Sequence, residues 1–469
     1  MQAESKLNGK TFSIVTLGCA KNRSDTEGMT SLLSDRGLSA MLEPEDADVV
    51  IVNTCGFLGA SRAESVSVVQ EMVDAKRPGQ FVVAAGCMPA LGDYRNDLPS
   101  GIDRILTTRE WFKIGETVGS LFGEEIKPLV AGCDGIATTF AHSHAGPSAY
   151  VKIADGCDHA CAFCTIPSIK GGQSSKRPLH VLQEIVDLVS RGTKEIVLVS
   201  QDTIRYGADL GAKHGLAELL QNIAEQVPDL PWLRVLYIYP NPTVLRMIDT
   251  MADHESLINY IDMPLQHSAP SVLKRMLRPS DPKLTRRLLD HARANLHDVA
   301  LRTTFITGFP GETEQDFQAL LRFVECEEFD HVGVFTYSPE PGTVAFFLGD
   351  PVAVELAEER RGLIMEAQQH ISWRRNQARI GERVQVLVEA IGESEDELGR
   401  TEPLTVGRTW RNAPEVDGLV FLPGELPIGQ MIDATIVDAT EYDLWAEPDA
   451  DLVTTGTQSG ALLSSGHTR

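Results

Sequence analysis

One segment, Ala149-Tyr-Val-Lys-Ile-Ala-Asp-Gly-Cys157-Asp-His-Ala-Cys161-Ala-Phe-Cys164, joins an apolar run to three closely spaced cysteines. The run Ala149–Ala154 has the length and composition of a buried strand. The cysteines follow at once, so their thiols can converge on one metal centre. Three thiolates suit an iron–sulfur cluster, because a 4Fe-4S cluster bound in this way keeps one iron open for an exogenous ligand. A structural zinc site is the alternative, but its fourth ligand would be His159, whose spacing is too tight for a tetrahedron.

The segment opens a longer alternation of strands and helices, predicted to span residues 148–377. Further apolar runs that predict strands are Glu195–Ser200, Leu233–Ile238, Leu301–Ile306 and Val332–Tyr337. Helical patterns such as His180–Ser190 separate them, and a long helix over Val354–Arg379 is expected to close the module. Parallel strands alternating with helices predict a full or partial β/α barrel, with its active site at the carboxyl ends of the strands.

The residues before this module show the same alternation on a smaller scale. Strands are predicted at Thr11–Leu17, Asp48–Asn53 and Gln80–Ala85, with helices near Asp25–Ser34 and Ser61–Ala75. This order predicts a doubly wound α/β domain over residues 10–125. Residues 126–147, rich in Ala, Gly, His and Ser towards their end, are predicted to form a linker.

The last part of the chain changes character. Val384–Glu389, Gly418–Phe421 and Met431–Ala439 are short strand candidates separated by turn residues. They predict a small, OB-like β-barrel over residues 378–449. The Thr-, Gly- and Ser-rich residues 450–469 are predicted to be disordered.

A second set of cysteines lies in the first domain, each at or just after the carboxyl end of a predicted strand. These are Cys19, Cys55 and Cys87. The carboxyl ends of parallel strands share one rim of a sheet, where ligands bind. Each cysteine alone would be interpreted as a small core residue. Together, with an adjacent glycine that permits close backbone approach in each case, they favour a second cluster.

The pattern Cys157-x-x-x-Cys161-x-x-Cys164 resembles the motif of radical S-adenosyl-L-methionine (SAM) enzymes. The resemblance implies that these three cysteines hold a 4Fe-4S cluster whose open iron binds the amino and carboxylate groups of SAM. It also implies reductive cleavage of SAM to a 5′-deoxyadenosyl radical, with the aromatic Phe163 beside the cofactor.

Other strand ends carry weaker signals. Thr307-Gly-Phe-Pro-Gly-Glu312 resembles a loop that supports SAM, so Gly308 is a candidate contact, although a plain Gly–Pro turn is the alternative. Ser200–Thr203 could face the nucleoside, whereas His267 is interpreted as structural.

From about Thr11 to Pro448 the chain resembles the radical SAM methylthiotransferases, which have an N-terminal domain, a radical SAM barrel and a C-terminal TRAM β-barrel. The resemblance implies that Cys19, Cys55 and Cys87 hold an auxiliary 4Fe-4S cluster that supplies or tethers sulfur. It implies two molecules of SAM, one as radical source and one as methyl donor. Cys133 and Cys326 match no motif and are assigned no role.

Two branches of this family differ in substrate. One modifies adenosine in tRNA, and the other modifies the β-carbon of an aspartate in protein twelve of the small ribosomal subunit. Four segments resemble the second branch: Leu17–Asn22, Tyr237–Pro240, Tyr260–His267 and Gly407–Gly418. One departure is Lys176, which stands where the family often has arginine and cannot form a bidentate fork. The protein substrate is expected, with tRNA adenosine as the alternative.

Charge gives an independent argument. The formal net charge is -24, and residues 381–450 hold sixteen acidic residues against four arginines, a net of -12. A tRNA-binding module would present Lys and Arg to phosphates. The acidic module instead predicts docking of a basic ribosomal-protein loop, with tRNA disfavoured. The alternative is that these acids merely keep the surface soluble.

Composition excludes several other classes of protein. No apolar run approaches the ~18 residues of a membrane span, and Met1–Lys10 lacks the apolar core of a secretory signal. Eight cysteines in 469 residues are too few for a disulfide scaffold. We therefore expect a cytoplasmic enzyme with reduced thiols, served by an unidentified electron donor and sulfur source. A non-catalytic iron–sulfur carrier is the alternative from another class, and SAM cleavage would distinguish the two.

Overall fold

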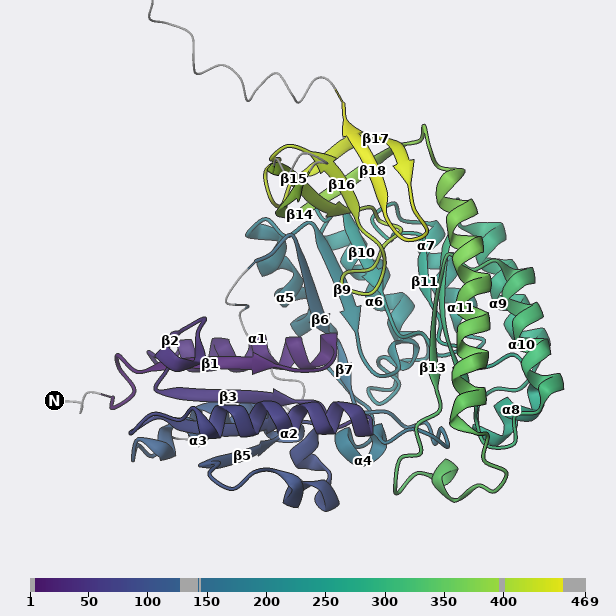
Figure 1. Ribbon diagram of the computed structural model, residues 1–469. Coiled ribbons are helices and arrows are strands. Elements are labelled where there is room, and N and C mark those ends of the chain that lie inside the picture. The colour runs from purple at the N-terminus through teal and green to yellow at the C-terminus, as the bar shows by residue number, and fades with distance from the viewer. Residues whose placement is uncertain (1–4, 127–141, 143–144, 396–400, 450–469) are drawn as a thin grey trace, which may run out of the picture. The chain divides into compact units, whose positions relative to one another are not determined.

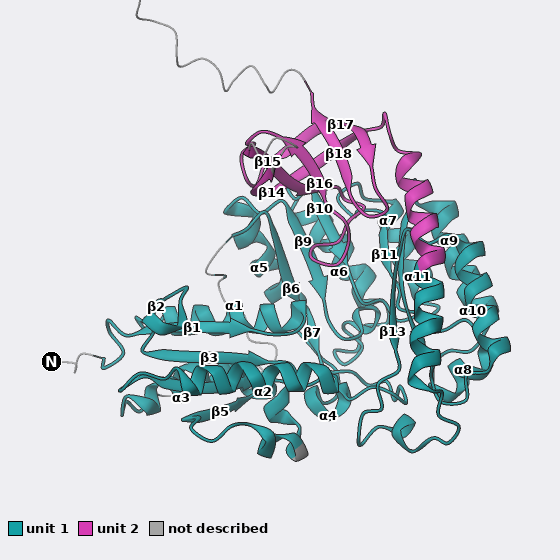
Figure 2. Cartoon of the chain, in the orientation of Figure 1, with its two compact units in different colours: residues 1–365 teal, residues 366–469 magenta. Residues whose placement is uncertain are grey.

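The computed structural model describes residues 5–126, 142, 145–395 and 401–449. The chain forms two compact units, residues 1–365 and 366–469 (Figure 2), and the boundary falls within helix α11 (Val354–Gln377). Most of the predicted linker, Cys133 and the predicted disordered tail lie outside the described residues. The proposed domain boundaries remain predictions.

The N-terminal domain is a parallel sheet of five strands in the order β2-β1-β3-β4-β5 (Figure 1). Its elements are β1 Thr11–Thr16, α1 Ala20–Ser34, β2 Ser39–Ala40, β3 Val49–Thr54, α2 Gly59–Asp74, β4 Phe81–Gly86, β5 Arg104–Thr107 and α3 Ile114–Leu121. The central strand β3 is buried along its whole length. One apolar core joins α1 and α3 to the sheet. Helices α1 and α3 thus cover one face of the sheet, and α2, which contacts β3 and β4, covers the other, as expected for parallel strands.

The second domain of the first unit is an open barrel of six parallel strands. Two three-stranded sheets, β6-β9-β10 and β11-β12-β13, are joined where Ile238 N donates to Asp262 O at 2.9 Å. The strands are β6 Ser148–Lys152, β9 Glu195–Val199, β10 Trp232–Val235, β11 Tyr260–Asp262, β12 Ala300–Thr307 and β13 His331–Thr336, with the small hairpin β7 Ala154–Asp155 and β8 Ser174–Ser175. The helices are α4 Ile166–Lys170, α5 Pro178–Ser190, α6 Gly215–Gln226, α7 Val244–Ala252, α8 Pro270–Arg275, α9 Pro282–Asn295, α10 Glu314–Glu327 and α11.

The second unit contains a closed barrel of five strands in the order β14-β15-β16-β18-β17. The strands are β14 Arg383–Glu395, β15 Thr401–Arg408, β16 Val420–Pro423, β17 Met431–Ala439 and β18 Leu444–Pro448. Alternating side chains of these strands, such as Val386, Val388 and Ile432, fill the interior. Alternation along each strand and closure into a barrel leave this small domain without an open sheet edge.

The predicted fold class is confirmed, with the second domain a partial barrel. The predicted strands and helices lie within a few residues of the observed ones, but helix α1 begins at Ala20, directly after Cys19, rather than near Asp25. Strands β2, β5, β8 and β11, which have only two to four residues, were not predicted, and neither were the longer strands β15 and β18 of the C-terminal barrel. Among the described residues, no helix combines the length and the apolar character needed to cross a membrane.

His142, inside the segment predicted as a linker, is buried in a cluster of charged groups. Its Nδ1 lies 2.5 Å from Glu27 and its Nε2 lies 2.8 Å from Glu184, which also pairs with Lys176 at 2.6 Å. Burial opposes protonation, but hydrogen bonds to Glu184 and Glu27 outweigh it and raise the pKa of His142 to about 9. The imidazolium therefore ties α1 of the first domain to α5 of the second.

This arrangement makes the stability of the protein depend on pH. The pKa of His142 in the folded protein lies above its ordinary value. Its contribution to the free energy of unfolding, roughly 3 kcal/mol at most, is therefore complete below about pH 6.5 and is lost as the pH rises towards 9. We expect the difference in free energy of unfolding between the natural protein and His142→Gln to shrink over that range. Urea unfolding at several pH values measures it, and a pH-independent difference would contradict the assignment.

Candidate active site

The cysteines of the barrel domain lie in the loop between β7 and α4. Cys157 N donates to Gly171 O at 3.0 Å, which closes the base of the loop, and Cys164 N donates to Cys161 O at 3.1 Å, which turns its end. Parallel strand β6 delivers this loop to the carboxyl end of the barrel, where catalytic groups of β/α barrels gather.

Two other segments hold the middle of the loop in place. Ala162 N donates to Met276 O at 2.9 Å, and Ala345 N donates to Ala162 O at 2.7 Å. Ala162 itself is buried in an apolar cluster with Phe309. The spacing of the three thiols is thus fixed by backbone contacts from segments more than a hundred residues away.

The thiols of this barrel triad influence one another electrostatically and are largely desolvated. Burial raises the pKa of Cys157 to about 11 and that of Cys164 to about 12, and in both cases the neighbouring cysteines raise it further. Both of these thiols therefore resist ionisation at neutral pH unless positive charge is bound beside them. A polynuclear iron centre supplies the positive charge that makes such thiols ligating thiolates.

The N-terminal cysteines lie after three neighbouring strands of the sheet. Cys19 follows β1 and caps α1, Cys55 directly follows β3, and Cys87 directly follows β4. All three adjacent glycines are needed for this approach, since a Cβ at Gly86 would lie 2.5 Å from the carbonyl oxygen of Thr54. A Cβ at Gly18 would lie 2.9 Å from the Cβ of Cys55, and one at Gly56 would lie 2.9 Å from the amide nitrogen of Met88.

The surroundings of the N-terminal triad shift the pKa values of its three thiols in different directions. Burial raises the pKa of Cys55 and raises that of Cys87 to about 12. Desolvation also acts on Cys19, but Lys21 and nearby amide N–H groups outweigh it, so the pKa of Cys19 is lowered. Cys87 Sγ lies 3.5 Å from Asn22 Oδ1, one turn into α1.

A hydrogen bond joins the two segments that carry the triads. Thr165 follows Cys164, and its Oγ1 donates to the carbonyl oxygen of Phe57, two residues after Cys55, at 3.2 Å. Nearby, Lys21 Nζ of α1 lies 3.2 Å from the ring centre of Tyr237, which follows β10. The six cysteines predicted as ligands therefore belong to one region of the first unit.

The donor sets fit two iron–sulfur clusters better than zinc. Each triad offers three thiols and no adjacent fourth ligand. In the part of the chain that the structure describes, no three His, Cys, Asp or Glu side chains lie close enough to hold one metal ion, and this includes the thiols of each triad. His159, the fourth ligand that the zinc alternative requires, bonds Asp202 through Nε2 at 2.6 Å and stacks on Tyr239 with ring centres 3.7 Å apart, so only its Nδ1 would be left for a metal.

Buried polar atoms without a protein partner lie at the carboxyl ends of the barrel strands. They include Gln201 Oε1 after β9, Ser268 Oγ after β11 and Tyr337 Oη after β13. Unpaired buried polar atoms are costly, so their presence at one end of the barrel indicates a polar ligand. The amino, carboxylate and ribose groups of SAM have the required chemistry.

Comparison with known proteins agrees with this geometry. Three family models match in order: the uncharacterized protein family UPF0004 at residues 11–98, the radical SAM superfamily at 151–324 and the TRAM domain at 380–448. A protein of Chloroflexus aurantiacus, named ribosomal protein uS12 methylthiotransferase RimO, is 44% identical and aligns with 93% of this chain and 99% of its own. A protein of the same name from Microcystis aeruginosa is 41% identical, over 94% of this chain and 99% of its own.

The chain belongs to the RimO family. It is a radical SAM methylthiotransferase, and the radical SAM superfamily implies a 4Fe-4S cluster and SAM. The relatives carry the name of the ribosomal-protein branch, so the alternatives of a tRNA-modifying enzyme and of a non-catalytic carrier are not supported. A solved radical SAM methyltransferase, TsrM from Kitasatospora setae, is 14% identical with a TM-score of 0.51, over 75% of this chain and 78% of its own. At that identity the likeness shows the fold alone.

Two further predicted cofactor contacts have clear structural surroundings in this RimO-family chain. Phe163 packs edge-on against Phe309, with ring centres 6.4 Å apart. Gly308 has a φ of +73°, its amide donates to Glu312 at 2.7 Å, and a Cβ there would meet Ala357. Both positions brace the site, and a contact with SAM remains a prediction for each.

The sequence did not identify a stacked group beside the barrel triad. Tyr239 stacks on His159 at 3.7 Å, and the guanidinium of Arg278 lies 4.1 Å from the same ring. The imidazole of His159 and the guanidinium of Arg278 are too close to the Tyr239 ring to lie on the same face of it, so they lie on opposite faces. Arg278 also directs Nη1 to Cys161 Sγ at 3.8 Å. The segment Tyr237–Pro240 resembles a family motif, but the sequence does not indicate that Tyr239 contacts Arg278, which only the fold shows.

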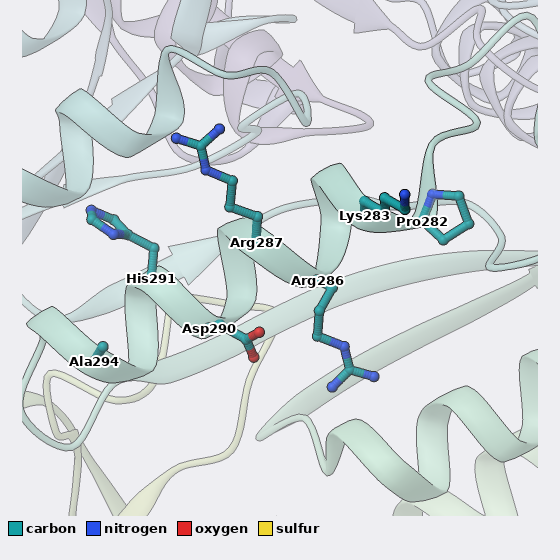
Figure 3. A pocket seen from close by; sticks show the side chains of 7 residues that line it. All are labelled: Pro282, Lys283, Arg286, Arg287, Asp290, His291 and Ala294. Carbon is teal, nitrogen blue, oxygen red and sulfur yellow. The ribbon is translucent and has the colours of Figure 1, made fainter.

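A hollow of about 680 Å³ over the outer face of α9 is not this site (Figure 3). No thiol and no residue from a barrel strand end contributes to its lining. Figure 3 shows that the side chains of Arg286 and Arg287 point away from each other, so they do not converge on one ligand. Arg286 is moreover paired with Glu327 at 2.6 Å.

Proposed function

We propose that this RimO-family enzyme transfers a methylthio group to the β-carbon of an aspartate in ribosomal protein uS12, using two 4Fe-4S clusters and two molecules of SAM. The observation that carries the proposal is the hydrogen bond between Thr165 and Phe57, which joins the segments that carry Cys164 and Cys55. An electron donor and a sulfur source are required as partners. We assign the reaction to the cytoplasm, where thiols stay reduced.

Cys157, Cys161 and Cys164 would hold the cluster that faces SAM, and Cys19, Cys55 and Cys87 would hold the auxiliary cluster. When bound, the first cluster would supply the electron that cleaves SAM to a 5′-deoxyadenosyl radical, and the auxiliary cluster with a second SAM would supply the methylthio group. A radical is required because the β-carbon of an aspartate has no proton acidic enough to remove at neutral pH. The buried loops of the chain keep water away from that radical.

The remaining residues of the site orient and tune these groups. Asp202 accepts from His159 and fixes its imidazole against Tyr239. Arg278 directs its positively charged Nη1 to the sulfur of Cys161 at 3.8 Å. Phe163 and Gly308 would lie beside SAM. The unpaired polar atoms of Gln201, Ser268 and Tyr337 are suited to its polar groups.

An anaerobic assay tests the proposed function. Enzyme with both clusters reconstituted is given SAM and a reductant, with purified uS12 in one tube and bulk tRNA in another. Mass spectrometry is expected to find one added methylthio group on an aspartate of uS12 and none on tRNA. Modified adenosine would reject the proposed substrate.

The C-terminal TRAM barrel offers an acidic surface for the basic protein substrate. Its described arginines are engaged within the barrel: Arg383 pairs with Asp449 at 2.6 Å, Arg408 is buried against Glu389, and Arg411 is buried beside Trp410. Acidic residues in contrast are exposed, among them Glu393, Glu402 and Glu425. Strand pairing sets Glu393 opposite Pro403, and Gly424 donates to Pro403 at 3.0 Å, so these three acids form one edge of the barrel.

We expect the double variant Glu402→Lys and Glu425→Lys to raise KM for uS12 about tenfold at low salt and to leave kcat unchanged, because charge complementarity acts on association. The KM of the natural enzyme for uS12 should approach that of the double variant as salt is added, since salt screens the attraction between exposed charges. The double variant Asp438→Lys and Glu447→Lys, at exposed positions of β17 and β18, is the matched control and should change KM less than threefold. Equal effects of the double variant and the control would assign the acids to solubility alone.

A further inference from the structure

Four charged side chains form a closed ring inside the first unit. Lys152 donates to Asp25 and, at 3.0 Å, to Asp155, while Lys170 donates to Asp25 at 3.1 Å and to Asp155 at 3.0 Å. None of the four is more than 2% exposed. Two carboxylates and two ammonium groups balance in charge, so the ring is neutral.

The ring crosses from one cysteine-bearing domain to the other. Asp25 is in α1, which begins directly after Cys19 and lies beside β6 (Figure 1). The other three members belong to the barrel domain and flank the barrel triad: Asp155 comes two residues before Cys157, and Lys170 comes six residues after Cys164. Asp25 is thus the single group through which the ring reaches the N-terminal domain.

A second contact reinforces the same junction. Arg109 of the N-terminal domain donates to the carbonyl oxygens of Ser168 and Ile169, both at 2.8 Å, and so caps the last turn of α4. The loop of the barrel triad is therefore held from both of its ends, by Asp155 before it and by α4 after it.

Stability alone does not account for this ring. Burying four charges is costly, and well-packed apolar side chains of similar volume often do as well or better, whereas ion pairs with fixed geometry define one relative arrangement. The two contacts to Asp25 each fix a direction and a length between the domains. A sliding or tilting of α1 against β6 would break contacts that apolar packing would tolerate.

We infer that the ring of Asp25, Lys152, Asp155 and Lys170 is a positioning device that sets the N-terminal thiol triad against the barrel triad. The inference rests on the proposed function, since it concerns the step that needs both triads. SAM cleavage needs only the barrel triad, whereas methylthio transfer needs a substrate radical close to the other triad. Misplacement of reacting groups by about 1 Å can cost 100-fold. Variants that loosen the ring should therefore lower methylthio transfer much more than SAM cleavage.

The informative variant removes the link between the domains and keeps the charge balanced. Asp25→Asn with Lys152→Met leaves Lys170 and Asp155 as a neutral pair within the barrel domain. A milder variant, Asp25→Glu, keeps all charges and lengthens one arm of the ring by a methylene group. Glu195→Gln is the matched control, because it breaks a buried ion pair with Arg234 at 2.6 Å that lies wholly within the barrel.

Hydrogen exchange on the anaerobic holoprotein tests the inference without any substrate. The amides of α1 and α4 are expected to exchange at least tenfold faster in the balanced double variant, and measurably faster in Asp25→Glu. In Glu195→Gln they should change less than twofold. Exchange in α1 and α4 that is unchanged in both ring variants would overturn the inference.

The second readout is the ratio of 5′-deoxyadenosine to methylthiolated uS12. In both ring variants this ratio is expected to rise, about tenfold or more in the double variant, with SAM cleavage retained within about threefold. The control should keep the natural ratio. A parallel fall of both products would assign the ring to folding and overturn the inference. If the natural enzyme made no methylthiolated uS12, the proposed function would fail, while the exchange result would still decide the role of the ring.

Discussion

Replacing Cys164 by alanine is expected to abolish both 5′-deoxyadenosine and methylthiolated uS12. The barrel triad has three thiols, and no further cysteine lies among the described residues of its loop. A cluster bound there would therefore lose one of its three protein ligands and would no longer be retained. Changes around metal ligands cost about 10- to 100-fold, and removal of a ligand is expected to cost more than about 100-fold. The loop should keep its shape, because its hydrogen bonds come from backbone groups of Cys157, Ala162 and Cys164.

Chromatography of the nucleoside and mass spectrometry of uS12 measure the two products separately. Cys326→Ala is the control, since Cys326 is an exposed cysteine of α10 without an assigned role. It should keep full activity. A Cys164→Ala enzyme that retained more than a tenth of either product would remove Cys164 from the ligand set.

Replacing Cys87 by alanine is expected to have a different signature: 5′-deoxyadenosine persists, and methylthiolated uS12 disappears. Cys87 is the most buried member of the N-terminal triad and lies on the sheet, outside the barrel that would bind SAM. Iron bound per chain should fall by about half, because one of two clusters of equal size is lost.

The contrast between Cys87→Ala and Cys164→Ala is the decisive comparison. Loss of 5′-deoxyadenosine in both variants, with the iron content of Cys87→Ala still halved, would mean that SAM cleavage also depends on the N-terminal triad. Full methylthiolation by Cys87→Ala would exclude Cys87 as a ligand. Iron content and visible absorption of each holoprotein, measured before the assay, separate failed cluster binding from failed chemistry.

The parts of the site that follow a strand could be predicted from the sequence. An apolar run followed by a cysteine marks the carboxyl end of a strand, and parallel strands bring such ends together, so Cys19, Cys55 and Cys87 could be grouped without coordinates. The motif around Cys157 is local and needs no fold at all. The three domain types could be predicted in the same way, because periodicity is a local property.

The contacts that connect these parts could not be predicted. Asp25 and Lys170 are 145 residues apart, and nothing near either residue indicates the other. Thr165 and Phe57 are separated by 108 residues. Charge and hydroxyl groups of this kind are usually exposed, so a sequence alone gives no reason to place them in an interior. Tyr239 and Arg278 were missed for the same reason.

The separation of the ring along the chain has a consequence for biosynthesis. Cys87 completes the N-terminal triad, whereas Lys170, the last member of the ring, follows 83 residues later. At about 5–20 residues per second, the ribosome needs roughly 4 to 17 s to make that interval. During this time the nascent chain holds all three N-terminal thiols, and the helix that will face them has not yet been synthesised. The ring of Asp25, Lys152, Asp155 and Lys170 can therefore close only after all three N-terminal thiols have been synthesised.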